Sequence, residues 1–90
     1  MVNYYDLIIR SNRTDYKIKD RECWGTRRAS DAHEIIFILE QTRGWFAHNN
    51  FTIKPGFKVL PVDDPDEYVI TSISYPEKRP FKTILTTVRV

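Results

Sequence analysis

Cysteine is nearly missing from this sequence, and long hydrophobic runs are missing altogether. Cys23 is the only cysteine among the 90 residues, so the chain cannot form an internal disulfide, and a single thiol is typical of a reducing compartment. The longest unbroken apolar run, 35–39, is far shorter than the ~20 residues that a membrane-spanning helix needs. The first ten residues lack the basic segment and apolar run of a secretory signal. We therefore expect a cytoplasmic protein that does not enter a membrane.

The net charge is small, but it is unevenly distributed. Apolar residues make up 41% of the sequence and aromatic residues 13%, which is enough for one hydrophobic core in a single domain, 1–90. Residues 1–28 carry seven basic and four acidic side chains, whereas residues 63–90 carry four basic and five acidic ones. This asymmetry predicts a basic face and an acidic corner.

Alternating apolar and polar residues predict strands near the start of the sequence. Residues 4–10 and 16–19, joined by the turn residues SNRTD, predict an N-terminal hairpin with Tyr16 and Ile18 inward and Lys17 outward. Residues 25–29 are expected to connect this hairpin to a helix. Further strands are predicted at 57–62, 67–75 and 81–90, the last two of them rich in the Ile, Val, Thr and Tyr that suit a half-buried sheet, and the segment 51–54 precedes the first of the three across a KPG turn.

Residues 31–45, DAHEIIFILEQTRGW, are predicted to form the helix. Either Asp31 or Ser30 can cap its start, Glu34 completes a capping box with Asp31, and Gly44 suits the position after its end. At about 100° per residue, one stripe would face the sheet, formed by Ala32, Ile35, Ile36 and Leu39. The predicted fold is α+β in the order β-β-α-β-β-β, with one helix packed on a mainly antiparallel, curled sheet of about five strands.

Phe37 falls on the polar side of this predicted helix, opposite its apolar stripe. Either a partner contacts Phe37, which includes a second copy of the chain, or a second layer of the same chain covers it. We predict partner contact, because Phe, Trp, Arg and His are residue classes that anchor protein interfaces. The predicted partner-binding residues are Phe37, His33, Gln41, Arg43 and Trp45.

Basic residues gather around the predicted hairpin and the connector after it. The predicted basic surface consists of Arg13, Lys17, Lys19, Arg21, Arg27 and Arg28. Such a row can follow a phosphate backbone while Tyr4, Tyr16 or Trp24 stacks on unpaired bases. Lysines on an edge strand also solvate that edge and prevent pairing with other chains. Direct binding of RNA or single-stranded DNA is therefore the alternative hypothesis, although no known nucleic-acid-binding motif accompanies these residues.

No pattern in the sequence predicts catalysis or metal binding. The candidates for nucleophilic chemistry are Cys23, His33 and His48, and nothing in their spacing brings them together. The acidic segment 63–67, DDPDE, lacks the glycine and the alternating ligands of a calcium loop, so it predicts a charged turn. We expect a protein that is not an enzyme and that uses no metal or cofactor.

In layout, a single small domain with a hairpin, one helix and a sheet resembles many small phage-encoded inhibitors of host defence, anti-CRISPR proteins among them. The resemblance spans the whole chain and lies in the predicted order of elements rather than in a motif. It implies an inhibitor or adaptor that occludes a partner protein that handles nucleic acid. We therefore predict a protein partner, with self-association as a homodimer as one option.

Overall fold

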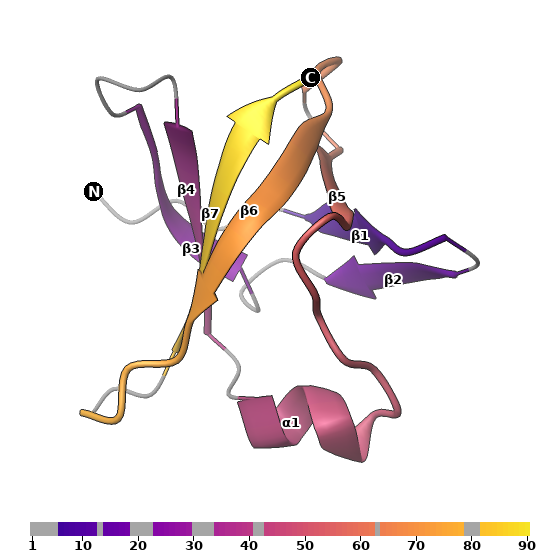
Figure 1. The fold of residues 1–90 in the computed structure, drawn as a ribbon, viewed down its shortest axis with the longest axis vertical. Helices are drawn as coiled ribbons and strands as arrows, with labels where there is room; N and C mark the ends of the chain where they lie inside the picture. The colour runs from indigo at the N-terminus through magenta and orange to yellow at the C-terminus, as the bar shows by residue number, and fades with distance from the viewer. Residues whose placement is uncertain are drawn as a thin grey trace.

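Antiparallel strand pairing organises the part of the chain that the structure describes (Figure 1). The computed structural model describes residues 6–12, 14–18, 23–29, 34–40, 43–62, 64–78 and 82–90, with the backbone alone at 23–29 and 43. Its elements are β1 (Leu7–Arg10), β2 (Asp15–Ile18), β3 (Cys23–Ala29), β4 (Glu34–Leu39), α1 (Arg43–His48), β5 (Lys58–Pro61), β6 (Tyr68–Ser74) and β7 (Thr83–Arg89). The described strands form one open sheet in the order β2-β1-β5-β6-β7-β4-β3.

The hairpin and the two C-terminal strands lie where the sequence predicts them. In the hairpin, β1 pairs with β2, so that Ile9 lies opposite Tyr16 and Ile8 opposite Lys17. Ile18 is buried and Lys17 is exposed, as the alternation predicts. The pairing of β6 with β7 is also antiparallel, and both segments are rich in residues that suit a pleated, half-buried surface.

The predicted helix at 31–45 is wrong, because residues 34–39 form strand β4. β4 pairs with β7 along its whole length, with Phe37 opposite Leu85 and Ile38 opposite Ile84. Every residue from 35 to 39 is apolar, so this run matches a helical stripe and a strand equally well. Its isoleucines and its phenylalanine favour a strand, since branched and aromatic side chains pack well in sheets.

The predicted connector and the overall order of elements are also wrong. Residues 23–29, of which 25–29 were predicted to be a connector, form β3 and pair with β4, whereas residues 51–54 are not in a strand. A mainly antiparallel sheet with one short helix is confirmed, but the described residues hold seven strands rather than about five. The resemblance to phage-encoded inhibitors was drawn from an order of elements that this structure does not have.

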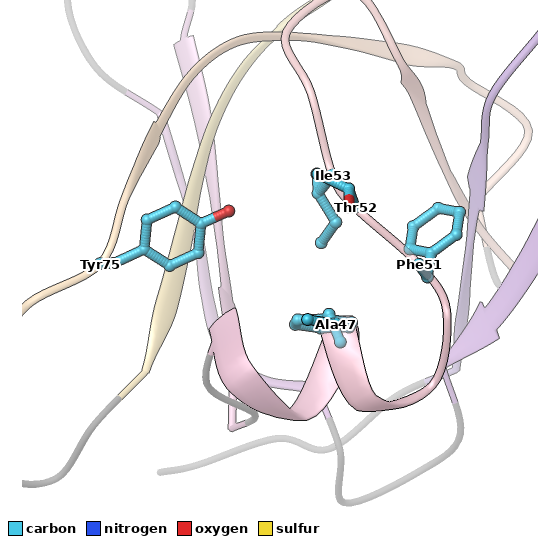
Figure 2. Close-up of a pocket in the computed structure, with 6 residues that line it drawn as sticks. Ala47, Phe51, Thr52, Ile53 and Tyr75 are labelled. Atoms are coloured by element: carbon cyan, nitrogen blue, oxygen red, sulfur yellow. The ribbon is translucent and has the colours of Figure 1, made fainter.

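The described helix, α1, begins where the predicted helix was expected to end, and lies at one end of the sheet (Figures 1 and 2). Asn50 has a φ of 59° and follows the helix as its left-handed residue, in a Schellman arrangement. The amide of Phe51 donates to the carbonyl of Phe46 (2.9 Å), and that of Asn50 to Ala47 (3.0 Å). This turn brings both phenylalanines into the core. No helix in the described ranges is long and apolar enough to cross a membrane.

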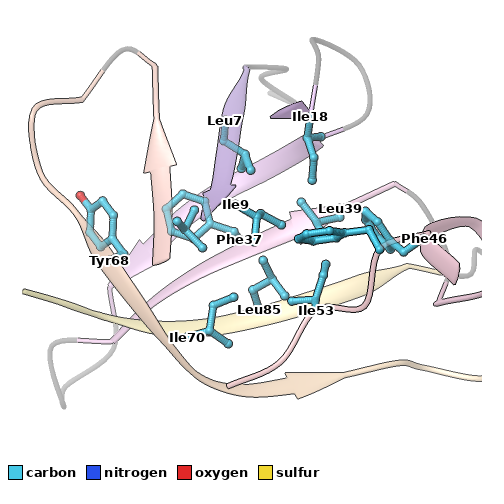
Figure 3. Packing of buried hydrophobic residues seen from close by; sticks show 12 residues of the cluster. Leu7, Ile9, Ile18, Phe37, Leu39, Phe46, Ile53, Tyr68, Ile70 and Leu85 are labelled. Carbon is cyan, nitrogen blue, oxygen red and sulfur yellow. The ribbon is translucent and has the colours of Figure 1, made fainter. Parts of the chain in front are cut away.

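The inner face of the sheet encloses the hydrophobic core. Strands β1 and β2 cross the direction of β6 and β7 (Figure 1), and Figure 3 shows side chains from both parts meeting between them. Register shifts in β6, between Ile70 and Ser72, and in β3 mark irregularities that help a sheet to bend. The buried cluster consists of Leu7, Ile9, Ile18, Phe37, Leu39, Phe46, Phe51, Ile53, Val59, Tyr68, Ile70 and Leu85.

Candidate functional site

Phe37, the central residue of the predicted partner-binding set, lies in the core. Its side chain is 0% exposed and packs edge to face against Tyr68, with 5.4 Å between ring centroids and 68° between ring planes. The prediction that Phe37 lies on an exposed helix face is therefore wrong. In a strand, side chains alternate between two faces, so Phe37 shares the inner face with Ile35 and Leu39.

The other residues of that predicted set do not form one rim with Phe37. Trp45 lies on α1, half buried, with its ring edge to face against Tyr16 (6.2 Å between centroids) and Phe46 (5.2 Å). For Arg43 the structure describes only the backbone, in the first turn of α1. His33 and Gln41 lie outside the described residues. Partner contact by these four residues stays a prediction.

The predicted basic surface is described in part. Lys17 is exposed on β2, Arg27 and Arg28 lie on β3, where only the backbone is described, and the described ranges do not include Arg13, Lys19 or Arg21. Tyr16 stacks on Phe51, with 4.5 Å between ring centroids and 20° between planes. Its neighbour Lys17 points to the opposite face of the strand. The nucleic-acid hypothesis proposed that Tyr16 stacks on a base beside Lys17. The structure does not place Tyr16 for that role, because the two side chains lie on opposite faces of the strand.

Strands β4, β7 and β6 carry a second apolar surface on the outer face of the sheet. Ile36 of β4 lies opposite Thr86, Ile38 lies opposite Ile84, and none of the three isoleucines is fully buried. We call this surface the outer patch, and its residues are Ile36, Ile38, Ile84, Val88 and Val69. An antiparallel sheet usually carries polar residues on the face that contacts water. The outer patch instead carries partly exposed aliphatic residues, so it is a candidate interface.

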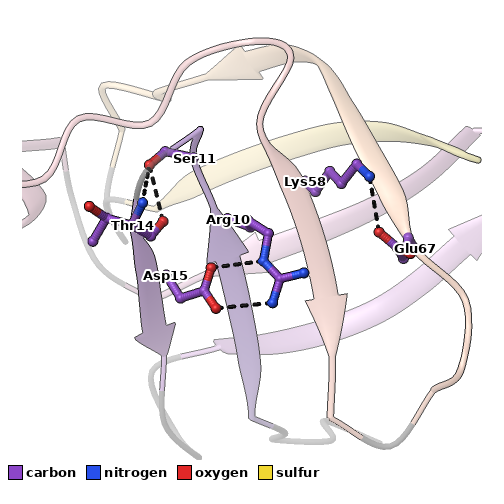
Figure 4. A network of polar contacts seen from close by, with 6 residues as sticks. All are labelled: Arg10, Ser11, Thr14, Asp15, Lys58 and Glu67. Atoms are coloured by element: carbon purple, nitrogen blue, oxygen red, sulfur yellow. Dashed lines mark hydrogen bonds and ion pairs between the residues drawn. The ribbon is translucent and has the colours of Figure 1, made fainter.

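Charged residues also lie on the outer face of the sheet, on β1, β2 and β5 (Figure 4). Arg10 donates two hydrogen bonds to Asp15, from Nε to Oδ1 (2.8 Å) and from Nη2 to Oδ2 (3.0 Å). These bonds lower the pKa of Asp15 and raise that of Arg10. Lys58, which pairs in register with Arg10, contacts Glu67 at 3.2 Å. Aliphatic Ile8 and Leu60 lie beside these charged residues on β1 and β5, and Glu34 and Thr86 lie beside the outer patch on β4 and β7.

The acidic segment near the start of β6 acts as a structural turn where it is described. Asp64 accepts a hydrogen bond from the Tyr68 hydroxyl (2.7 Å) and another from the backbone N–H of Asp66 (2.8 Å). Asp66 also pairs with Arg89 (3.3 Å). Among the described residues, no three His, Cys, Asp or Glu side chains are grouped so that they could hold a metal ion.

Tyr68→Phe is expected to lower the free energy of unfolding by about 1–2 kcal/mol, because the hydroxyl of Tyr68 donates a part-buried hydrogen bond to the Asp64 carboxylate. Burial and the hydrogen bond to Asp64 raise the pKa of Tyr68 above 10.0. The folded protein thus holds this proton more tightly than the unfolded chain, so its contribution is present below about pH 10 and is lost as the pH rises further. Urea unfolding of the wild type and the variant at about pH 8 and pH 10.5 tests this.

The Tyr68→Phe variant should therefore lose less stability than the wild type between these two pH values. Equal urea midpoints for wild type and variant, or parallel losses of stability at high pH, would contradict the role given to this hydroxyl.

No protein-family model matches the sequence, and no curated protein or solved structure is significantly similar to it. The outer patch was not predicted, because a helix at 34–39 would place Ile36 in the core. Once 34–39 is known to be a strand, its apolar residues at both odd and even positions indicate a sheet that is covered on both faces.

Proposed function

We propose that this protein is a small, non-enzymatic binding protein whose outer patch covers a surface of a partner protein. The observation that carries the proposal is that β4 is apolar on both faces from Ile35 to Leu39. Phe37 and Leu39 are completely buried, whereas Ile36, on the outer face, remains partly exposed. Burial of apolar surface is favourable, so a strand of this composition is stabilised most when both of its faces are removed from water. A partner surface would supply the second cover.

The charge distribution supports a partner that meets an apolar centre with a polar border. The ion pairs Arg10–Asp15 and Lys58–Glu67 lie on the outer face, and Lys17 lies opposite Ile8 on that face. Interfaces commonly combine an apolar core with a polar rim. The excess of basic residues in 1–28 favours a partner that handles nucleic acid or presents an acidic surface. Bound in this way, the protein would act by occlusion, as an inhibitor or adaptor.

The test is a double variant of the outer patch, Ile36→Thr with Ile84→Thr. Threonine keeps the branched shape that suits a strand and places a hydroxyl in the apolar surface. The matched control is Val62→Thr, because Val62 is 67% exposed and lies outside the patch. Wild type, control and double variant are used to capture proteins from a cell lysate, with and without nuclease treatment. The affinity of the purified captured protein for each is then measured.

We expect the double variant to raise the dissociation constant at least about tenfold, as loss of interface hot spots does, while the control binds like the wild type. If a second copy is the partner, sedimentation should show that the wild type dimerises and the double variant does not. Unchanged affinity of the double variant would overturn the proposal. Binding that disappears after nuclease treatment and falls steeply with salt would favour the RNA or single-stranded DNA hypothesis instead.

A further inference from the structure

A small pocket lies beside α1 (Figure 2), and none of the residues that line it belongs to the outer patch. It has a volume of about 150 Å³ and is lined by Phe46, Ala47, Phe51, Thr52, Ile53 and Tyr75. Phe46, Phe51 and Ile53 are buried and form its apolar wall, Ala47 and Thr52 are exposed, and Tyr75 is half buried. The pocket therefore has a buried apolar interior and an opening that solvent can reach.

The wall and the size of the pocket limit what it can bind. A cavity of roughly 150 Å³ lined by aliphatic and aromatic side chains accommodates one benzene ring. An ionised ligand would lose its hydration against the apolar wall without a compensating charge among the lining residues. The hydroxyl of Tyr75 faces across the pocket toward Ile53 in Figure 2, and a tyrosine hydroxyl both donates and accepts hydrogen bonds. The lining thus favours a neutral ring with one polar substituent.

We propose that this pocket binds a single aromatic ring that carries a hydroxyl group. The ring packs against Phe46, Phe51 and Ile53, and its hydroxyl lies near that of Tyr75. A free phenol and the tyrosine side chain of a peptide offer the same chemistry. The site is separate from the outer patch, so this inference goes beyond the proposed function and does not depend on it.

The probe is p-cresol, which is the side chain of tyrosine without its backbone. Titration into the isotopically labelled protein should shift the amide signals of Ala47, Thr52 and Ile53. A ligand of eight non-hydrogen atoms at about 0.5 kcal/mol per atom gives a dissociation constant on the order of 1 mM. N-acetyltyrosinamide then separates the two sources. Binding as strong as that of p-cresol identifies a peptide tyrosine, and binding of p-cresol alone identifies a free phenol.

Two substitutions at the opening are designed to block the pocket while leaving the core unchanged. Ala47→Leu adds a larger side chain at an exposed helix position, where leucine is well tolerated, and Thr52→Leu does so from the opposite side. Each should weaken p-cresol binding at least about tenfold. His48→Leu is the control, because His48 is exposed on the same helix and does not line the pocket.

A separate measurement, the relative binding of p-cresol and toluene, tests the role of the Tyr75 hydroxyl. Tyr75→Phe should reduce the preference for p-cresol over toluene without preventing toluene from binding. The absence of signal shifts at about 10 mM p-cresol, ten times the expected dissociation constant, would overturn the proposal. Binding that survives both blocking variants, with their spectra otherwise unchanged, would overturn it as well.

Discussion

Replacing Phe37 with alanine is expected to lower the free energy of unfolding by about 3–5 kcal/mol, the cost typical of a fully buried phenylalanine. Phe37 is 0% exposed, contacts the ring of Tyr68 and pairs across the sheet with Leu85. Its removal would leave a cavity between β4 and β6 and would also remove an aromatic pair. Denaturant unfolding, compared at the midpoint with an unchanged slope, measures the effect.

The neighbouring residue provides a matched control for Phe37→Ala. Ile36 lies on the outer face of the same strand and is partly exposed, so Ile36→Ala should cost clearly less, on the order of 1 kcal/mol. The helical hypothesis requires the opposite order, because it places Ile36 in the core and Phe37 toward solvent. A greater loss for Ile36→Ala than for Phe37→Ala would contradict the strand.

Leu85→Asp is expected to leave most of the protein unfolded. Leu85 is 0% exposed and lies on the inner face of β7, where a carboxylate would lose its hydration without a basic partner in the apolar cluster around it. The cost of such a change commonly exceeds about 4 kcal/mol, which approaches the whole stability of a small domain. Circular dichroism and urea unfolding would both report the loss.

The control for Leu85→Asp is Ile36→Asp, on the outer face of the adjacent strand. A carboxylate there keeps contact with water, so the variant should remain folded and unfold cooperatively, with a loss of about 1–2 kcal/mol. The helical hypothesis predicts that Ile36→Asp unfolds much of the population. Loss of the fold in Ile36→Asp, together with tolerance of Leu85→Asp, would reverse the assignment of the two faces.

The hairpin could be predicted from the sequence because its residues alternate, and the two C-terminal strands because they are rich in Ile, Val, Thr and Tyr. In β1 and β2, burial follows polarity, with Leu7, Ile9 and Ile18 buried and Lys17 exposed. In β7, Leu85 faces inward between two threonines, Thr83 and Thr87, that the sheet also buries. A period of two residues is a local property of the chain, so it can be recognised without knowing the partner strand.

The segment 34–39 could not be assigned from its pattern because all its central residues are apolar. Such a run contains a helical stripe and an alternating strand at once. The decision comes from β7, which lies more than 40 positions further along the chain and pairs with β4 residue by residue. Pairing between distant segments is a tertiary effect that overrides local preference. Because β4 occupies residues 34–39, the helix α1 begins only after that strand has ended, at Arg43.

The sequence by itself determined which kinds of residue lie where along the chain. It has enough apolar residues for one small core, a basic N-terminal third, an acidic turn and a run of apolar residues around Phe37. Only the tertiary structure decided which of those apolar residues face outward. A helix would expose Phe37 and bury Ile36, whereas the strand buries Phe37 and leaves Ile36 partly exposed. The physical reason is the change of side-chain period from 3.6 residues to two, which assigns neighbouring residues to opposite faces. Because residues 34–39 pair with β7 as a strand, the candidate interface contains Ile36 rather than Phe37.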